Sequence, residues 1–392
     1  MAVTFMCGFE SAASLVDGIV LSTNAAYSTT QARTGTRSIR VNPGSGAQGT
    51  ANIATPGQGW FHFALYITTL PSVSRQIVHS STTGQAALML SSTGTLQCWV
   101  NNTNIGSSSA LSTGRWYWIG LRDKTSASDV EWLQVDGVGQ NCLATATITT
   151  TIGWFGCGGT EASAIDIYFD DVIGDDAGFL APSNVALLLP ISDNARATLW
   201  TGGSGGTTNL YDAVNNCPPV GSATESNTTQ IEHAGGAVSS TDAYDANLTT
   251  YTTAGVGSGD TVLAAQALIV WGEDIATGTK LLSYRIDSNP LVFGELSIDV
   301  STGHGSGAVG TYSTGADYWN ERRSAIKTTG LVIGTDITLG TSPVFHVVRP
   351  ETASRVASVC FTGMYVAWTP YVAPPAAGPP IQPKVYPQIL VQ

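Results

Sequence analysis

The chain has 392 residues, a length that can hold two or three domains with ordinary hydrophobic cores. Its formal net charge is −12 and only 11% of its residues are charged, so it lacks the clustered Lys and Arg that a nucleic-acid partner requires. Hydrophobic residues make up 43% of the chain, which argues against disorder, and 44 glycines indicate strands joined by tight turns. We therefore predict an all-β protein.

Residues 1–182 are predicted to form the first domain, because short apolar or alternating runs separated by turn residues fill this segment. The N-terminus lacks a basic stretch followed by an apolar run, so no signal peptide is expected. No apolar run reaches the roughly 18 residues of a membrane-spanning segment, so no membrane insertion is expected. The predicted strands are 3–9, 36–41, 60–67, 76–80, 86–90, 96–100, 116–121, 130–135, 147–151 and 165–173.

The most informative stretch lies between residues 114 and 137, where two aromatic-rich runs flank a polar turn. In the first run, 116–121, side chains on both faces are apolar, as in a central strand of a β-sandwich. We expect the second run, 130–135, to pair with it and Asp136-Gly137 to form a tight hairpin turn. The stretch predicts an architecture and no particular chemistry.

Several short segments of the first domain occur in an order and spacing that are more specific than any one of them. They are 8–10, 34–40, 114–119, 135–137 and 165–172. With these segments the domain resembles the concanavalin A-like (LamG-like) jelly rolls of virion proteins in tailed bacteriophages. The resemblance implies a jelly-roll sandwich in a minor tail protein, fibre or capsid decoration protein. It also implies a virion location after synthesis in the host cytoplasm, with other virion proteins and further copies of the chain as partners.

Residues 183–371 are predicted to form a second β-sandwich domain. The run at 262–271 is apolar on both faces, as a buried central strand should be, although periodicity alone does not distinguish it from a helix. Residues 372–392 are predicted to form an extended arm, because a proline-rich segment cannot pair well in a sheet. We expect this arm to lie along a neighbouring chain or its own domain, with contacts from Pro374, Pro375, Pro379, Pro380, Tyr386, Ile389 and Leu390.

The densest group of carboxylates lies near the end of the first domain, at Asp166, Asp170 and Asp171. One interpretation is a calcium site, because Ca²⁺ takes several oxygen ligands from one sheet edge. The other interpretation is structural: Asp166 and Asp170 face outward along a strand, and Asp175-Asp176 forms a turn. The spacing of a helix-loop-helix calcium loop is absent. No other cofactor is expected.

Glycan binding is the ligand function that the sequence favours, because sugar rings stack on exposed aromatic side chains and Asn side chains bind sugar hydroxyls. For each aromatic residue taken singly, however, the favoured interpretation is that it fills the core, where its large area is most useful. The candidates are Trp99, Asn101, Trp154 and Trp319. A glycan on a host surface is the expected ligand.

Catalysis is not expected. Retaining glycoside hydrolysis needs two carboxylates about 5 Å apart on one face. Glu131 and Asp136 fall on opposite faces of a regular strand, and the hairpin turn requires Asp136. Asp129 alternates with Glu131 but stands at the beginning of the strand.

Six cysteines show neither a C-x-x-C pair nor a zinc-binding spacing with the five histidines. We expect them to be buried free thiols that fill the core. The best alternative is a disulfide between Cys142 and Cys157, which flank one predicted hairpin.

Taken together, the sequence predicts a non-enzymatic structural component of a tailed-phage virion, assembled through its sandwich faces and C-terminal arm, with a glycan-binding surface. The first alternative is a soluble, lectin-like carbohydrate-binding module. The second, less favoured, alternative is a polysaccharide hydrolase. A lectin should not need residues 372–392, whereas an assembly protein should fail to incorporate without them. A hydrolase should turn over polysaccharide and lose that activity when Asp129 or Glu131 is replaced.

Overall fold

A computed structural model shows an almost entirely β protein, which confirms the predicted fold class. It describes residues 3–372 apart from the gaps listed at the end of this paragraph, and the Pro-rich arm at 373–392 lies outside the described residues. In the described part of the chain, no helix has the length and apolar character needed to cross a membrane. The gaps are 12–16, 54–58, 81–85, 123–131, 141, 143–151, 159–161, 197–199, 203–207, 215–230, 234–242, 274–280, 289–290, 300–311, 315–316 and 349–356.

Two antiparallel sheets form the first sandwich. Sheet A has the order β13 (Val138–Gly139), β12 (Leu133–Val135), β11 (Trp116–Arg122), β6 (Trp60–Thr69), β15 (Asp166–Asp175), β4 (Ser38–Val41) and β3 (Ala25–Ser28), with β1 (Val3–Cys7) also paired to β15. Sheet B has the order β10 (Thr103–Ala110), β9 (Thr95–Val100), β8 (Ala86–Leu90), β7 (Arg75–Ser80), β14 (Ile152–Gly158), β5 (Gly49–Ile53) and β2 (Ile19–Leu21).

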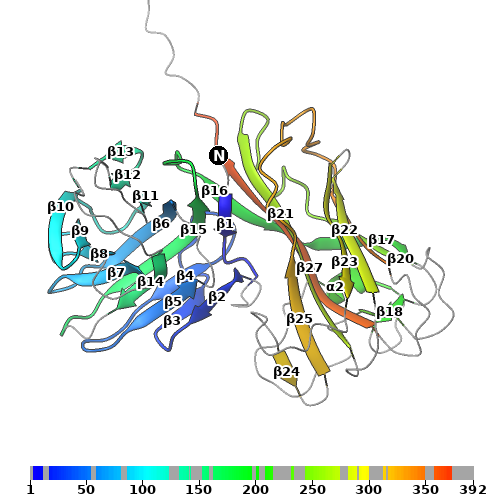
Figure 1. Cartoon of the computed structure of the whole chain (residues 1–392), viewed down its shortest axis with the longest axis horizontal. Helices are drawn as coiled ribbons and strands as arrows, with labels where there is room; N and C mark the ends of the chain where they lie inside the picture. The colour runs from blue at the N-terminus through cyan, green and yellow to red at the C-terminus, as the bar shows by residue number, and fades with distance from the viewer. Residues whose placement is uncertain are drawn as a thin grey trace, which may run out of the picture.

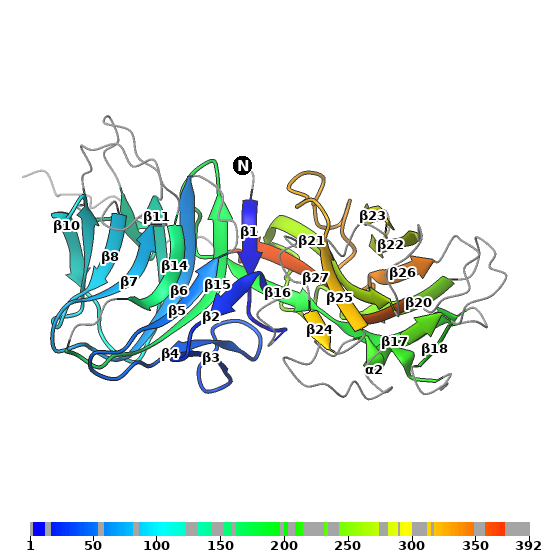
Figure 2. The same ribbon diagram turned by 60° about the horizontal axis from the view of Figure 1, so that its bottom comes forward.

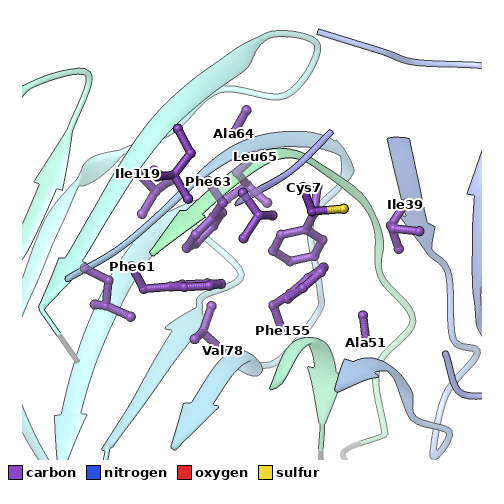
Figure 3. Packing of buried hydrophobic residues seen from close by; sticks show 14 of the residues in the cluster. Cys7, Ile39, Ala51, Phe61, Phe63, Ala64, Leu65, Val78, Ile119 and Phe155 are labelled. Carbon is purple, nitrogen blue, oxygen red and sulfur yellow. The ribbon is translucent and has the colours of Figure 1, made fainter. Parts of the chain in front are cut away.

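The core of this sandwich is built from the inward-facing alternate residues of both sheets. Phe61 of sheet A meets Phe155 of sheet B, Phe155 lies 5.0 Å from the ring of Phe169, and Phe63 contacts both Phe61 and Phe169. All four side chains are buried, and Figure 3 shows this packing at close range. Because strand residues alternate between faces, each inward residue fixes its two chain neighbours on the outer face.

The predicted aromatic hairpin is confirmed in its described part. Ile119 pairs with Val135 and Leu121 pairs with Leu133, so β11 and β12 are neighbours as expected. Asp136 and Gly137 follow with φ values of 51° and 78°, which is the backbone of a tight two-residue hairpin turn. The Asp136 carboxylate also accepts a hydrogen bond from the N–H of Trp118 at 2.8 Å.

Two further antiparallel sheets form the second sandwich. Sheet C has the order β18 (Trp200–Gly202), β19 (Ile231–His233), β27 (Ala357–Thr369), β21 (Thr261–Glu273), β25 (Asp317–Arg323) and β24 (Tyr312–Thr314), with β16 (Asn184–Leu188) also paired to β27. Sheet D has the order β17 (Pro190–Arg196), β20 (Ala243–Leu248), β26 (Val344–Val348), β22 (Leu281–Ser288) and β23 (Leu291–Asp299). One short helix, α2 (Leu210–Ala213), accompanies them.

Sheet C is covered on both faces, which explains the two apolar faces predicted for the strand at 262–271. On β21, Ala265 and Ile269 belong to the core shared with sheet D, whereas Ala264 and Leu268 belong to the core of the first sandwich. Figures 1 and 2 both show β1 and β16 lying between the two sandwiches, next to β27. The two sandwiches therefore share a continuous apolar junction.

A buried polar cluster lies within this junction, around the carboxylate of Asp17. Ser11 Oγ and Tyr27 Oη each donate a hydrogen bond to it at 2.6 Å. Tyr365 Oη, from β27 of the second sandwich, donates a third. The guanidinium of Arg323 lies against the neighbouring Gly18. Asp17 and Tyr365 are fully buried, so this Asp17 cluster joins the two sandwiches through hydrogen bonds that water does not compete for.

The predicted disulfide between Cys142 and Cys157 is wrong, because both are buried free thiols. Gly106 of β10 pairs with Cys98 and also forms a bridge with Cys142, which brings Cys142 next to Cys98 instead. The prediction of buried free thiols is confirmed for Cys7, Cys98, Cys142 and Cys157.

Candidate functional site

Six strands of sheet B place paired side chains in one line across the outer face of the sheet. Trp99 of β9 and Trp154 of β14, two of the predicted glycan-binding residues, both lie in this line. They are three strand spacings apart, or about 14 Å between backbones. From one end to the other, the sheet B row consists of Asn104, Trp99, Ala87, His79, Trp154 and Asn52.

Strand alternation turns both indoles outward. Their chain neighbours Cys98 and Phe155 point into the core and are completely buried, so Trp99 and Trp154 face away from it. Each indole is half-buried, and Asn52 and Asn104 at the two ends are exposed. The interpretation that Trp99 and Trp154 fill the core is therefore wrong.

The indole of Trp154 is held in place by two neighbours. The imidazole of His79 stacks on it with ring centroids 5.3 Å apart and an angle of 5° between the planes. Its six-membered ring lies over Gly158, where a Cβ atom would come within 2.1 Å of Cη2. On β9, the Nε1–H of Trp99 points toward Gln97 Oε1 at 3.4 Å. Both indoles thus extend along their own strands, toward the next row.

Gly158→Ala should disturb the sheet B row without touching the core. The added methyl group cannot coexist with the present position of the Trp154 ring, so the indole must leave its stack on His79. We expect the intrinsic tryptophan fluorescence to change and the free energy of unfolding to fall by only about 1 kcal/mol. Chemical denaturation followed by fluorescence measures both. An unchanged spectrum would contradict the placement of Trp154 over Gly158.

A second row lies beside the first on the same face and carries polar side chains but no charged one. It consists of Ser107, Gln97, Met89, Gln76 and Gly158. Among the described residues of the two rows there is no Asp, Glu, Lys or Arg, although the chain carries a net charge of −12. The face therefore offers aromatic rings and neutral hydrogen-bonding groups, which suits binding and offers no carboxylate for acid–base chemistry.

The other two predicted glycan-binding residues lie elsewhere. Asn101 is exposed at the tip of the β9–β10 hairpin, where it and Asn102 form the turn with φ values of 49° and 62°. Its position is explained by the turn, since Asn tolerates positive φ. Trp319 belongs to β25 in the second sandwich, opposite Tyr312, and its side chain lies outside what the structure describes.

The three aspartates predicted as calcium ligands or rim residues are engaged with arginines and backbone amides. Asp166 forms a two-pronged ion pair with Arg40, with both N–O distances 2.9 Å. Asp170 accepts hydrogen bonds from the backbone N–H groups of Arg33 and Asp171, each at 2.8 Å. Burial and the adjacent charge of Asp171 raise the pKa of Asp170 well above its usual range.

Asp171 connects three segments of the chain. Its carboxylate pairs with Arg33 Nη1 at 2.6 Å and accepts the backbone N–H of Val185 at 2.7 Å. The prediction that Asp170 faces outward is wrong, because Asp170 is fully buried, as is Asp171, at a bulge in β15. Within the described residues, no three His, Cys, Asp or Glu side chains are grouped so as to hold a metal ion. The calcium hypothesis remains a prediction that these contacts do not support.

No family model and no curated protein matches this chain. Among solved structures, it is similar to the cellulose-induced protein Cip1, with a TM-score of 0.30 and 15% identity over 44% of this chain and 100% of that one. It is also similar to an alginate lyase Aly36B mutant in complex with an alginate trisaccharide, with a TM-score of 0.30 and 11% identity over 43% of this chain and 96% of that one. A third is Trypanosoma rangeli sialidase with the inhibitor DANA, with a TM-score of 0.28 and 14% identity over 38% of this chain and 26% of that one. Similarity at this level says nothing about the function of this chain.

The outer face of sheet A also carries aromatic residues, but there they pack against one another. Trp116 lies 5.4 Å from Tyr66, and Tyr66 meets Tyr168 edge to face at 6.0 Å. The guanidinium of Arg40 covers Tyr168 at 5.8 Å, and that of Arg33 covers Trp118 at 5.2 Å. These contacts between aromatic rings stabilise the outer face of sheet A. In the sheet B row, by contrast, Ala87 and His79 stand between the two indoles.

His62 lies under this face and gives the fold a defined pH dependence. It stacks on Trp118, and its Nε2 accepts the backbone N–H of Leu180 at 3.0 Å. Burial lowers the pKa of His62 to about 3 because the charged imidazolium cannot be hydrated there. The ordinary imidazole pKa is about 6.5, so below that pH the unfolded chain binds a proton that the folded chain does not.

We therefore expect the stability contributed by neutral His62 to be complete above pH 6.5 and to fall by about 1.4 kcal/mol per pH unit as the pH drops toward 3. His62→Gln keeps an acceptor for Leu180 and removes the titration. Urea unfolding of both proteins between about pH 7 and pH 4.5 measures the difference. If the free energy of unfolding changed with pH in the same way for both proteins, His62 would not titrate as described.

The sequence alone did not reveal four residues of the sheet B row: Asn104, Ala87, His79 and Asn52. His79 belonged to a predicted strand, but its partner strand was unknown. What placed it beside Trp154 was the pairing of β7 with β14, which joins segments far apart in the chain.

Proposed function

We propose that this protein binds glycans through the outer face of sheet B, without cleaving them, as a component of a tailed-phage virion. The observation that carries the binding proposal is the sheet B row, in which Trp99 and Trp154 face outward on one line. Separate half-buried indoles provide flat apolar surfaces for sugar rings. Asn52 and Asn104 at the two ends add exposed amides that can bind hydroxyl groups.

The chemistry of the face supports binding over hydrolysis. Glycoside hydrolysis uses a pair of carboxylates that flank the scissile bond. Among the described residues of the two rows there is no carboxylate, and His79, the one titratable side chain there, is stacked on Trp154. Asp129 and Glu131, which would act as the catalytic acids if the protein were a hydrolase, lie outside the described residues.

A glycan array probed with the intact protein tests the binding function. We expect saturable binding to some of the arrayed glycans, and no release of shorter products after long incubation. Trp116→Ala, which changes an aromatic residue on the outer face of sheet A, should bind like the wild type. Failure to bind any glycan would overturn the proposal, and the appearance of shorter products would show that the protein is an enzyme.

The virion role is supported by the resemblance of residues 1–180 to phage jelly rolls and by a surface with few charges. In this role the chain contacts other virion proteins and further copies of itself, and the arm at 372–392 supplies extended contacts at a low entropic cost. Mass measurement of the intact chain and of a chain ending at 371, with a search for both in purified particles, tests it. Incorporation only of the intact chain is expected. If the chain is a monomer both with and without residues 372–392 and is absent from particles, it is instead a soluble lectin-like module.

A further inference from the structure

We infer that the ligand of the sheet B row is an uncharged, extended glycan longer than a disaccharide, which lies across the strands of sheet B. This inference rests on the proposed glycan-binding function and specifies its ligand. It follows from three properties of the face: its charge, the spacing of its indoles and the position of its polar groups.

The charge of the face selects against acidic glycans. A uronic or sialic acid is normally bound by Arg or Lys, through charge-assisted hydrogen bonds. The described residues of the two rows include no Arg or Lys, and the chain as a whole carries a net charge of −12 that repels an anion. A basic glycan would need carboxylates, and the described residues of these rows include none. An uncharged glycan meets neither obstacle.

The spacing of the indoles determines the length of the ligand. Trp99 and Trp154 are about 14 Å apart along the row, and the exposed amides of Asn104 and Asn52 are about 24 Å apart. A disaccharide cannot reach both indoles over that span. Ala87 and His79, which stand between the indoles, are buried, so the contacts of a ligand in this row would be with the two indoles and the end amides.

The polar groups run parallel to the same line. Gln97, Gln76 and Ser107 lie in the second row, one step along the strands from the indoles. A chain that follows the sheet B row would therefore meet both indoles along its length and have neutral donors and acceptors along one side. A chain that ran along a strand would meet only one of the two indoles.

Calorimetric titration of the intact protein separates these possibilities. The probes are cellohexaose, xylohexaose and mannohexaose, their disaccharides, and a hexagalacturonate of the same length. We expect at least one neutral hexasaccharide to bind about tenfold or more tightly than its disaccharide. We expect its affinity to change less than about twofold between about 20 mM and 500 mM sodium chloride, because no charged pair is screened.

Trp99→Ala provides the matched variant. It should abolish most of the gain in affinity between disaccharide and hexasaccharide, because only the longer ligand reaches both indoles. Equal affinity for the two lengths, or tighter binding of the hexagalacturonate, would overturn this inference and leave the proposed glycan binding intact. Binding to no glycan, on the array or in solution, would overturn both.

Discussion

Asp17→Ala is expected to destabilise the protein by about 3–5 kcal/mol, because it removes the acceptor of three hydroxyl groups at once, two of them in fully buried hydrogen bonds. Tyr365 would then have its hydroxyl group inside the junction without the carboxylate that now accepts from it. The junction joins sheet C to the first sandwich. A weaker junction should therefore also let the two sandwiches separate more easily. Urea denaturation gives the free energy of unfolding, and limited proteolysis near residue 183 reports the separation.

Two variants distinguish this mechanism from general core damage. Asp17→Asn keeps an acceptor oxygen and removes a charge whose burial raises the pKa of Asp17, so it should cost much less than Asp17→Ala. Tyr365→Phe removes one hydroxyl group and should cost about 1–2 kcal/mol. Equal losses for Asp17→Asn and Asp17→Ala would show that the hydrogen bonds do not contribute as described.

Trp154→Ala is expected to weaken glycan binding about 10- to 100-fold, with much less effect on stability than a substitution of the adjacent core residue Phe155. The indole of Trp154 is half-buried on the outer face, where it stacks on His79 and lies over Gly158, whereas Phe155 is completely buried. Titration with the tightest-binding neutral hexasaccharide measures the binding loss, and thermal unfolding measures the stability.

The control for this loss lies on the opposite sheet. Trp116→Ala removes an indole of similar exposure that packs on Tyr66, so it should lower stability slightly and leave the affinity unchanged. If both variants lost binding equally, the loss would reflect a general disturbance of the first sandwich. The sheet B row would then no longer be the binding surface.

Local patterns predicted the elements of this fold well. The alternation in 116–121 specified a strand, and Asp136-Gly137 specified the tight turn that joins β12 to β13, because strand period and positive φ are properties of a few adjacent residues. The apolar run at 262–271 predicted a strand buried on both faces, and β21 is covered on both faces by the two cores. These inferences needed no knowledge of strand order.

The site could be predicted only in part, because it depends on pairings between distant segments. Trp99 and Trp154 were recognisable as candidates, but their alignment needs the strand order β9–β8–β7–β14, which the sequence does not encode locally. The burial of Asp170 and Asp171 was missed for the same reason. Their partners Arg33 and Val185 come from elsewhere in the chain, and only with these partners can two adjacent carboxylates be buried.

The most direct test of glycan binding by the sheet B row is the NMR response of the indole N–H groups during titration with a neutral hexasaccharide. The chain has ten tryptophans, and Trp→Phe variants at 99, 154 and 116 assign the three signals that matter. We expect the signals of Trp99 and Trp154 to shift together as the ligand is added, while that of Trp116 stays in place. Saturation of the protein without a shift of Trp99 and Trp154 would contradict binding at this row.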